Sequence, residues 1–443
     1  MTSFWCESAW LTGGFARNVR LTTADGFIRD VHVGAEPQPE DVRLHGVTLP
    51  GMANTHSHAF HRALRGRVNG GGGNFWSWRE QMYAVAAELN PDTYFALARA
   101  VFAEMVLAGV TVVGEFHYVH HRPGGKPFGD PNAMGLALRH AAEEAGIRLT
   151  LLDTCYLEGG LNGGGHVPLH PGQLRFSDGT VDAWAERMSS RRHATDMVRL
   201  GAAIHSVRAV RREDLHRVVE ASDGLPLHVH LSEQPGENLA CEMYYGLTPT
   251  RLLEEAGALG DRLTAVHATH LTDDDIARLG GSRTGACFCP TTERDLADGI
   301  GPGRALHDAG SPLSLGSDQH VVIDPFEELR GLEMHERLVT NERDRFAAND
   351  LLLAASFNGY RALGWGDGGH LSKGALADFV TVATDTVNTA GSLPEQIIYS
   401  CVASDVSSVV VAGEPVVRDG RHRIGDVGRL LGQAISRVLE PST

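Results

Sequence analysis

The sequence of 443 residues has little cysteine, no excess of basic residues and no long apolar run. Its 6 cysteines are too few for a disulfide scaffold and include no C-x-x-C pair, so we expect buried, reduced thiols. The 39 Lys and Arg against 55 Asp and Glu give a net charge of −16, which disfavours binding to nucleic acid or to an anionic membrane. The most apolar stretch, 101–113, carries Glu104 and is too short to span a bilayer. The first 15 residues show no secretory pattern, so we expect a cytoplasmic protein.

Short apolar runs alternate with amphipathic stretches from residue 47 onward, and helix-period segments such as 92–107 and 132–145 lie between many of them. Repeated strand–helix units predict a parallel sheet covered by helices, and eight units over about 300 residues fit a (β/α)8 barrel. A doubly wound sheet would need a glycine fingerprint after its first strand, which residues 50–54 do not form. The runs expected to be barrel strands are 47–52, 110–116, 149–154, 200–205, 227–231, 263–267, 285–289 and 313–316.

Strand patterns also occur at both ends of the chain, with turn residues between them. We therefore expect residues 1–48 and 371–443 to form one small β-sandwich domain beside a catalytic barrel of residues 49–370. Two glycine-rich segments, 69–74 and 158–165, are either surface loops or borders of the barrel mouth.

Histidines and carboxylates stand where several of the expected strands end. His56 and His58 follow the first strand and point to one side of it, and His230 ends the fifth strand. His267 and Asp318 end the sixth and eighth strands. Barrels of this type carry their catalytic residues at the carboxyl ends of the strands. Imidazoles and a carboxylate gathered there suit one Zn²⁺ with a position open for water, and Fe²⁺ or Mn²⁺ could use the same ligands.

These residues resemble the amidohydrolase superfamily over nearly the whole chain. Pro-Gly-Met at 50–52 leads into His56-Ser57-His58, and no lysine ends the fourth strand, which implies the one-metal deaminase branch. The further superfamily motifs are H-x-x-E at 230–233, His267, Gly-Ser-Asp at 316–318 and GHLSKGALAD at 369–378. Within that branch the chain resembles the formimidoylglutamate deiminase family of histidine degradation. The stretches that carry this likeness are NTHSHAFHRALR at 54–65, GEFHYVHH at 114–121, HSVRAV at 205–210 and CPTTERDLADG at 289–299.

The resemblance implies hydrolysis of N-formimino-L-glutamate to N-formyl-L-glutamate and ammonia by a zinc-dependent homodimer. Glu233 is implied to hand a proton to the leaving nitrogen, and His267 to stabilise the tetrahedral intermediate or to position the attacking water. Asp318 is implied to accept the proton of that water. A structural ion pair remains the alternative for Glu233, and a second metal or simple packing for His267. The implied metal ligands are His56, His58, His230 and Asp318.

A dicarboxylate substrate requires local cations in so acidic a protein, and guanidinium groups bind carboxylates bidentately. The resemblance places Arg79 and Arg208 on the substrate carboxylates, with Tyr118 and His205 as hydrogen-bond donors. A surface ion pair is the alternative for each arginine. His61 stands where the family has Gln; both side chains donate hydrogen bonds, but His changes charge near neutral pH.

Two other functions remain open. An aminohydrolase for a heterocycle, such as guanine, an adenosine derivative or a triazine, could use the same metal set. It would call for an aromatic pocket lined with amides rather than for Arg79 and Arg208. An inactive barrel that serves binding or assembly would have lost a metal or acid–base residue, and none is missing here.

Overall fold

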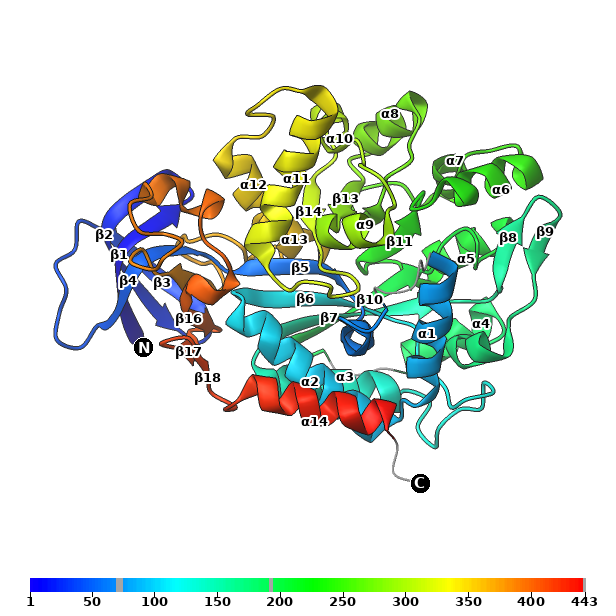
Figure 1. The fold of residues 1–443 in the computed structure, drawn as a ribbon, viewed down its shortest axis with the longest axis horizontal. Coiled ribbons are helices and arrows are strands. Elements are labelled where there is room, and N and C mark those ends of the chain that lie inside the picture. The colour runs from blue at the N-terminus through cyan, green and yellow to red at the C-terminus, as the bar shows by residue number, and fades with distance from the viewer. Residues whose placement is uncertain (69–74, 191–193, 441–443) are drawn as a thin grey trace.

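The computed structural model describes residues 1–68, 75–190 and 194–440, which form a barrel with a second β-sheet beside it (Figure 1). The barrel sheet has the order β14-β13-β12-β11-β10-β7-β6-β5, and its paired strands are parallel. A bridge between Ser57 and Asp318 closes it. The predicted (β/α)8 barrel is therefore confirmed. Its strands are β5 (Met52–Ser57), β6 (Val110–His117), β7 (Arg148–Cys155), β10 (Val198–Ile204), β11 (Leu227–Leu231), β12 (Leu263–His267), β13 (Gly285–Phe288) and β14 (Leu313–Leu315).

Helices surround this barrel. The start of α2 shows a local cause: the Asn90 side chain accepts two backbone N–H groups of the first turn, which Pro91 opens with its restricted φ. The helices are α1 (Phe75–Ala87), α2 (Pro91–Leu107), α3 (Ala133–Ala145), α4 (Val181–Ser189), α5 (Arg212–Ala221), α6 (Pro235–Tyr245), α7 (Pro249–Glu255), α8 (Asp273–Gly281), α9 (Pro290–Leu296), α10 (Gly303–Ala309), α11 (Pro325–Thr340), α12 (Ala348–Ala355), α13 (Phe357–Ala362) and α14 (Val427–Leu439). Short 3-10 helices are η1 (Ala59–Leu64), η2 (Pro171–Phe176), η3 (Pro394–Tyr399) and η4 (Ala403–Asp405).

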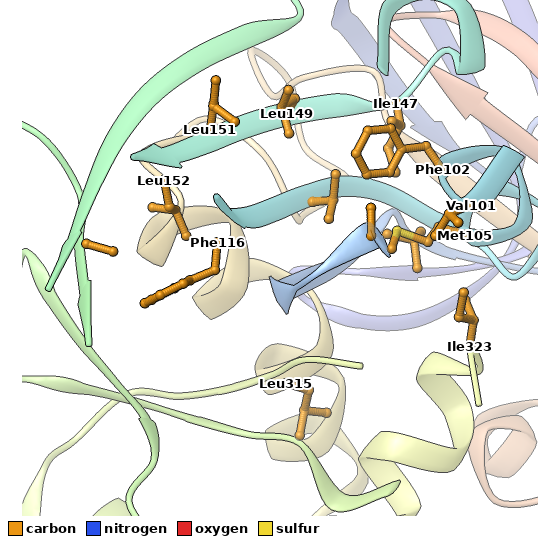
Figure 2. Packing of buried hydrophobic residues seen from close by; sticks show 14 of the residues in the cluster. Val101, Phe102, Met105, Phe116, Ile147, Leu149, Leu151, Leu152, Leu315 and Ile323 are labelled. Atoms are coloured by element: carbon orange, nitrogen blue, oxygen red, sulfur yellow. The ribbon is translucent and has the colours of Figure 1, made fainter. Parts of the chain in front are cut away.

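The largest core lies between the barrel strands and these helices. Val101, Phe102 and Met105 of α2 are fully buried in it, together with Phe116 of β6 and Leu149 of β7 (Figure 2). All eight residues of β6 are buried, as expected for a parallel strand covered on both faces. The core therefore fixes the strands whose ends carry the candidate site.

The second sheet draws its strands from both ends of the chain. Its order is β18-β17-β16-β15-β4-β1-β2-β3, and β4 pairs with β15, which joins the two terminal segments. Phe4 and Phe379 meet edge to edge in its core, with ring centroids 5.0 Å apart. The predicted sandwich-like β-domain built from both termini is confirmed. Its strands are β1 (Thr2–Leu11), β2 (Gly14–Ala24), β3 (Phe27–Val33), β4 (Val42–Pro50), β15 (Phe379–Val382), β16 (Val406–Val411), β17 (Glu414–Arg418) and β18 (Arg421–His422).

The expected first barrel strand, 47–52, is wrong. Residues up to Pro50 belong to β4 of the β-domain, and the barrel strand β5 begins at Met52. Gly51 joins the two strands, and its N–H donates to the Asp378 carbonyl at 3.0 Å. A Cβ at Gly51 would collide with the side chain of Thr111, so the junction requires glycine. Two buried strands joined by one residue read as a single apolar run, which concealed the boundary.

Helix α14 lies along α2 of the barrel rather than on the second sheet (Figure 1). The boundaries 1–48, 49–370 and 371–443 stay predictions. Within the described ranges, no helix combines the length and the apolar character needed to cross a membrane.

Candidate active site

Four side chains from three regions of the barrel converge at the carboxyl ends of its strands. His56 belongs to β5, His58 follows it, His230 belongs to β11 and Asp318 follows β14. The Nε2 atoms of His56 and His230 lie 3.1 Å apart. Asp318 Oδ1 lies 3.4 Å from Nε2 of both His56 and His58. All four predicted metal ligands therefore lie together in one buried cluster.

The surroundings of these imidazoles favour their metal-binding form. Nδ1–H of His58 donates to the Phe116 carbonyl at 3.0 Å, and Nδ1–H of His230 donates to the His205 carbonyl at 2.9 Å. A carbonyl only accepts, so the lone pair of each ring is on Nε2, toward the cluster. Burial lowers the pKa of His58 to about 3 and, with neighbouring imidazoles, lowers the pKa of His56 and His230 well below the usual value. Neutral nitrogen donors beside one carboxylate fit a divalent metal ion.

The backbone around the cluster adopts uncommon conformations. Asp318, His267 and Ser232 have φ values of 40°, 69° and 50°, in the left-handed region that residues other than glycine rarely enter. Such strain is typical of sites whose geometry the surrounding fold imposes. Asn54 secures the turn before Asp318, because its amide group exchanges two hydrogen bonds with Ser317 at 2.7 and 3.0 Å.

Glu233 and His267 lie beside this cluster, as predicted. His267 Nε2 is 3.9 Å from Glu233 Oε1 and 3.9 Å from Asp318 Oδ2. On its other edge, His267 Nδ1 lies 3.5 Å from Glu293 Oε1. Burial opposes protonation of His267, but Glu233, Glu293 and Asp318 outweigh it and raise its pKa to about 10. His267 thus lies between carboxylates that favour its protonated form, an arrangement suited to stabilising negative charge.

The predicted substrate residues line one cavity with His58, His230 and Asp318 of this cluster. His61 Nε2 lies 3.0 Å from the Tyr118 hydroxyl, and burial lowers the pKa of His61 well below its usual value. His61 is therefore neutral at neutral pH, as the Gln of the family would be. The cavity is lined by His58, His61, Arg79, Tyr118, His205, Arg208, His230, Glu233, His267 and Asp318, together with Trp78, Tyr83, Tyr156, Phe176 and Leu296.

Arg79 and Arg208 act on the same part of this cavity. Both guanidinium groups lower the pKa of His205, although burial is the larger cause. Both also favour the ionised form of Tyr156, where burial again dominates and raises its pKa. The two cations therefore both act on the part of the cavity that His205 and Tyr156 line. Neither predicted arginine is a fully solvated surface residue.

The glycine-rich segment 158–165 borders the cavity. It contains β8 (Gly160–Asn162) and the start of β9 (Gly165–Val167), which pair as a hairpin, and Glu158, Gly160 and Leu161 line the cavity. The segment was interpreted as either a surface loop or a border of the barrel mouth, and the structure supports the second interpretation. The other glycine-rich segment, 69–74, lies outside the described residues.

Models of known families match most of the chain. Residues 47–416 match the amidohydrolase family. The chain belongs to the amidohydrolase family. Residues 1–46 match the N-terminal domain of formimidoylglutamate deiminase HutF. This second match covers β1, β2 and β3 and the first part of β4.

Relatives of this amidohydrolase extend over nearly its full length. Formimidoylglutamate deiminase of Pseudomonas aeruginosa is 37% identical over 440 residues, which cover 95% of this chain and 96% of that protein. 8-Oxoguanine deaminase of the same organism is 30% identical over 431 residues, with 93% and 92% covered. The crystal structure of an amidohydrolase from Brucella melitensis has a TM-score of 0.92 at 33% identity and covers 99% of this chain and 100% of that one. The resemblance inferred from the motifs is confirmed.

Sequence reasoning missed a buried carboxylate of this amidohydrolase. Glu115 of β6 accepts from Ser57 Oγ at 2.6 Å and from the backbone N–H of Ala59 at 2.7 Å. It thereby holds the segment that carries His56 and His58. Burial raises the pKa of Glu115 to about 8. A lone acid in a mostly apolar strand run was the available signal, because such a group requires partners.

Proposed function

We propose that this amidohydrolase hydrolyses the formimino group of N-formimino-L-glutamate, giving N-formyl-L-glutamate and ammonia. The observation that carries the proposal is the common cavity of the His/Asp cluster, Glu233 and the guanidinium groups of Arg79 and Arg208. The protein is a hydrolase of C–N bonds, supported by its family and by its identity to a formimidoylglutamate deiminase. A linear amidine with two carboxylates matches both the His/Asp cluster and the two arginines of this cavity.

The metal in this proposal is one Zn²⁺ per chain. His56, His58, His230 and Asp318 would hold it, and Fe²⁺ or Mn²⁺ suits the same donors. When bound, the ion supplies Lewis acidity, which makes an attacking water nucleophilic at neutral pH.

Three side chains then move or hold protons. Asp318 accepts the proton that the attacking water loses as the new C–O bond forms. His267 donates a hydrogen bond to the developing charge, because its Nε2 faces both Asp318 and Glu233 at 3.9 Å. Glu233 delivers a proton to the formimino nitrogen, and the C–N bond breaks as ammonia leaves.

The remaining residues fix the substrate. Arg79 and Arg208 bind its two carboxylates, and their delocalised charge suits a bidentate contact. Tyr118 and His205 donate hydrogen bonds, and His61 supports Tyr118 through their 3.0 Å contact. Anchoring both ends holds the formimino carbon beside the cluster, which lowers the entropy cost of attack.

We further propose a cytoplasmic homodimer that acts in histidine degradation and that binds neither nucleic acid nor membranes. The net charge of −16 supports the absence of such polyanionic partners.

Hydrolysis of a heterocycle is the second candidate. Trp78, Tyr83, Tyr118 and Tyr156 make the cavity aromatic, and an 8-oxoguanine deaminase is 30% identical to the chain. However, no Asn or Gln lines the cavity within the described part of the chain, so no side-chain amide is present to read the edge of a base.

Ammonia release from N-formimino-L-glutamate by the zinc-loaded protein tests the proposal, with guanine and adenosine run in parallel. We expect N-formyl-L-glutamate as the product, and its loss in Glu233→Gln. Turnover of a heterocycle alone would keep the metal cluster but refute the roles of Arg79 and Arg208. No turnover of any of the three substrates would favour an inactive barrel.

A further inference from the structure

Arg208 lies between two carboxylates. Its Nη2 atom is 3.4 Å from Glu233 Oε2, and its Nε atom is 3.4 Å from Glu237 Oε2. Glu233 lines the cavity, whereas Glu237 does not. The Arg208 guanidinium therefore faces Glu233, the candidate acid–base group, on the cavity side. It faces Glu237 on the side away from the cavity.

The charge of Glu237 is energetically unfavourable in this position unless a partner compensates for its burial. It lies in the first turn of α6, and its side chain is 0% exposed. In the described part of the molecule, Arg208 is the cation recorded within ion-pair distance of it. Burial raises the pKa of Glu237, and the charge of Arg208 opposes this shift. A buried carboxylate is tolerated only where a partner compensates for the lost hydration, and Arg208 is that partner.

The ion pair at Nε bears on the orientation of Arg208. No hydrogen bond joins Nε to Glu237, so the carboxylate attracts this edge of the guanidinium by its charge alone. Because the group is planar, an attraction at the Nε edge leaves the Nη groups on the opposite side. With Nε toward Glu237, the Nη groups remain for the cavity, where Nη2 faces Glu233.

We propose that Glu237 is a positioning residue whose charge attracts the Nε edge of Arg208, so that the Nη groups can exchange Glu233 for a carboxylate of the substrate. This inference rests on the proposed function. It adds a specificity device: a substrate carboxylate that engages Arg208 also releases Glu233 toward the leaving nitrogen. An amidine without that carboxylate leaves Glu233 paired with Arg208.

Glu237→Gln tests this role, because it keeps the shape of the side chain and removes its charge. The matched control is Glu242→Gln, an exposed glutamate of the same helix. We expect Glu237→Gln to raise the KM for N-formimino-L-glutamate and the Kd of N-formyl-L-glutamate about tenfold, with kcat changed less than about threefold. Hydrolysis of formamidine, which has no carboxylate to engage Arg208, should not fall. Product affinity within about twofold of the wild type would overturn the inference.

A double-mutant cycle separates positioning from general packing. In an Arg208→Ala background, Glu237→Gln should cause no further loss of product affinity, because the group it orients is absent. The same loss in both backgrounds would mean that Glu237 acts through the fold and would refute the inference. Should Glu237→Gln not fold, Glu237→Asp withdraws the carboxylate by one methylene and should weaken product binding in the same direction; unchanged affinity would again refute it.

Failure of the proposed function has a different signature. A wild-type protein that neither hydrolyses N-formimino-L-glutamate nor binds its product would refute the proposed function. The crystal structure of ligand-free Glu237→Gln then still tests the positioning role. Arg208 is expected to turn away from its wild-type orientation, and an unmoved guanidinium would overturn the inference.

Discussion

Replacing Glu115 by alanine is expected to weaken the metal site without touching a metal ligand. The carboxylate accepts from Ser57 Oγ at 2.6 Å and from the Ala59 N–H at 2.7 Å, which flank His58 in the chain. Both donors are buried; the Ala59 N–H loses its partner at a cost of about 1–3 kcal/mol, whereas Ser57 Oγ keeps His320 Nε2 at 3.2 Å. If part of this cost appears as disorder of His56 and His58, metal affinity should fall about 10-fold to 100-fold, as for other groups that support metal ligands.

Competition with a chromophoric chelator measures this affinity for Zn²⁺. Glu115→Gln serves as the matched control, because its amide oxygen still accepts one of the two hydrogen bonds, and it should lose less affinity than Glu115→Ala. Thermal unfolding checks that both variants remain folded. Wild-type affinity in folded Glu115→Ala would refute the argument that this carboxylate orients the ligand segment.

Four further predictions follow from other contacts. Arg208→Ala should lower kcat/KM for N-formimino-L-glutamate by about 100-fold or more with unchanged zinc content, and unchanged kinetics would remove Arg208 from the site. His61→Gln should leave the pH–rate profile between about pH 6 and 9 unchanged, because His61 is already neutral there; a shifted acidic limb would contradict this. Asp378→Ala breaks the buried pair with Arg148 (2.7 Å) and should destabilise the fold by about 3–5 kcal/mol in urea unfolding, whereas a loss below about 1 kcal/mol would refute its structural role. Chelation of the metal should abolish activity and lower Tm, and Zn²⁺ should restore both; an unchanged Tm would separate metal binding from stability.

Much of the site was predictable because the barrel places strand ends together. His56, His230, His267 and Asp318 are far apart in the sequence, yet each follows or ends an apolar run. Parallel strands in a closed barrel bring such ends to one rim, so spacing along the chain carries three-dimensional information. The roles of the arginines were harder to predict. Only the motifs that contain Arg79 and Arg208, and not the hydrophobic periodicity, distinguished them from arginines of surface ion pairs.

Residues that act through other residues were not predictable in the same way. Glu115 lies within a strand and Glu237 within the first turn of a helix, and the sequence does not show which groups either carboxylate faces. Their roles depend on which donors face them across the barrel, such as Ser57 or Arg208. The boundary at Gly51 was hidden because the strand residues on both sides of it are buried and apolar in pattern, so that β4 and β5 resemble one strand in the sequence.

The closure of the barrel explains why the metal cluster lies at this position. The sheet order ends at β14 and β5, and an isolated bridge between Ser57 and Asp318 joins these ends in place of a regular ladder. The Asp318 N–H donates to the His56 carbonyl at 3.0 Å, and the His58 N–H donates to the Asp318 carbonyl at 3.1 Å. The backbone of the ligand segments is therefore itself the seam of the barrel. A metal ion held by His56, His58 and Asp318 would reinforce the seam that an isolated bridge closes in place of a ladder, which couples metal affinity to the stability of the whole barrel.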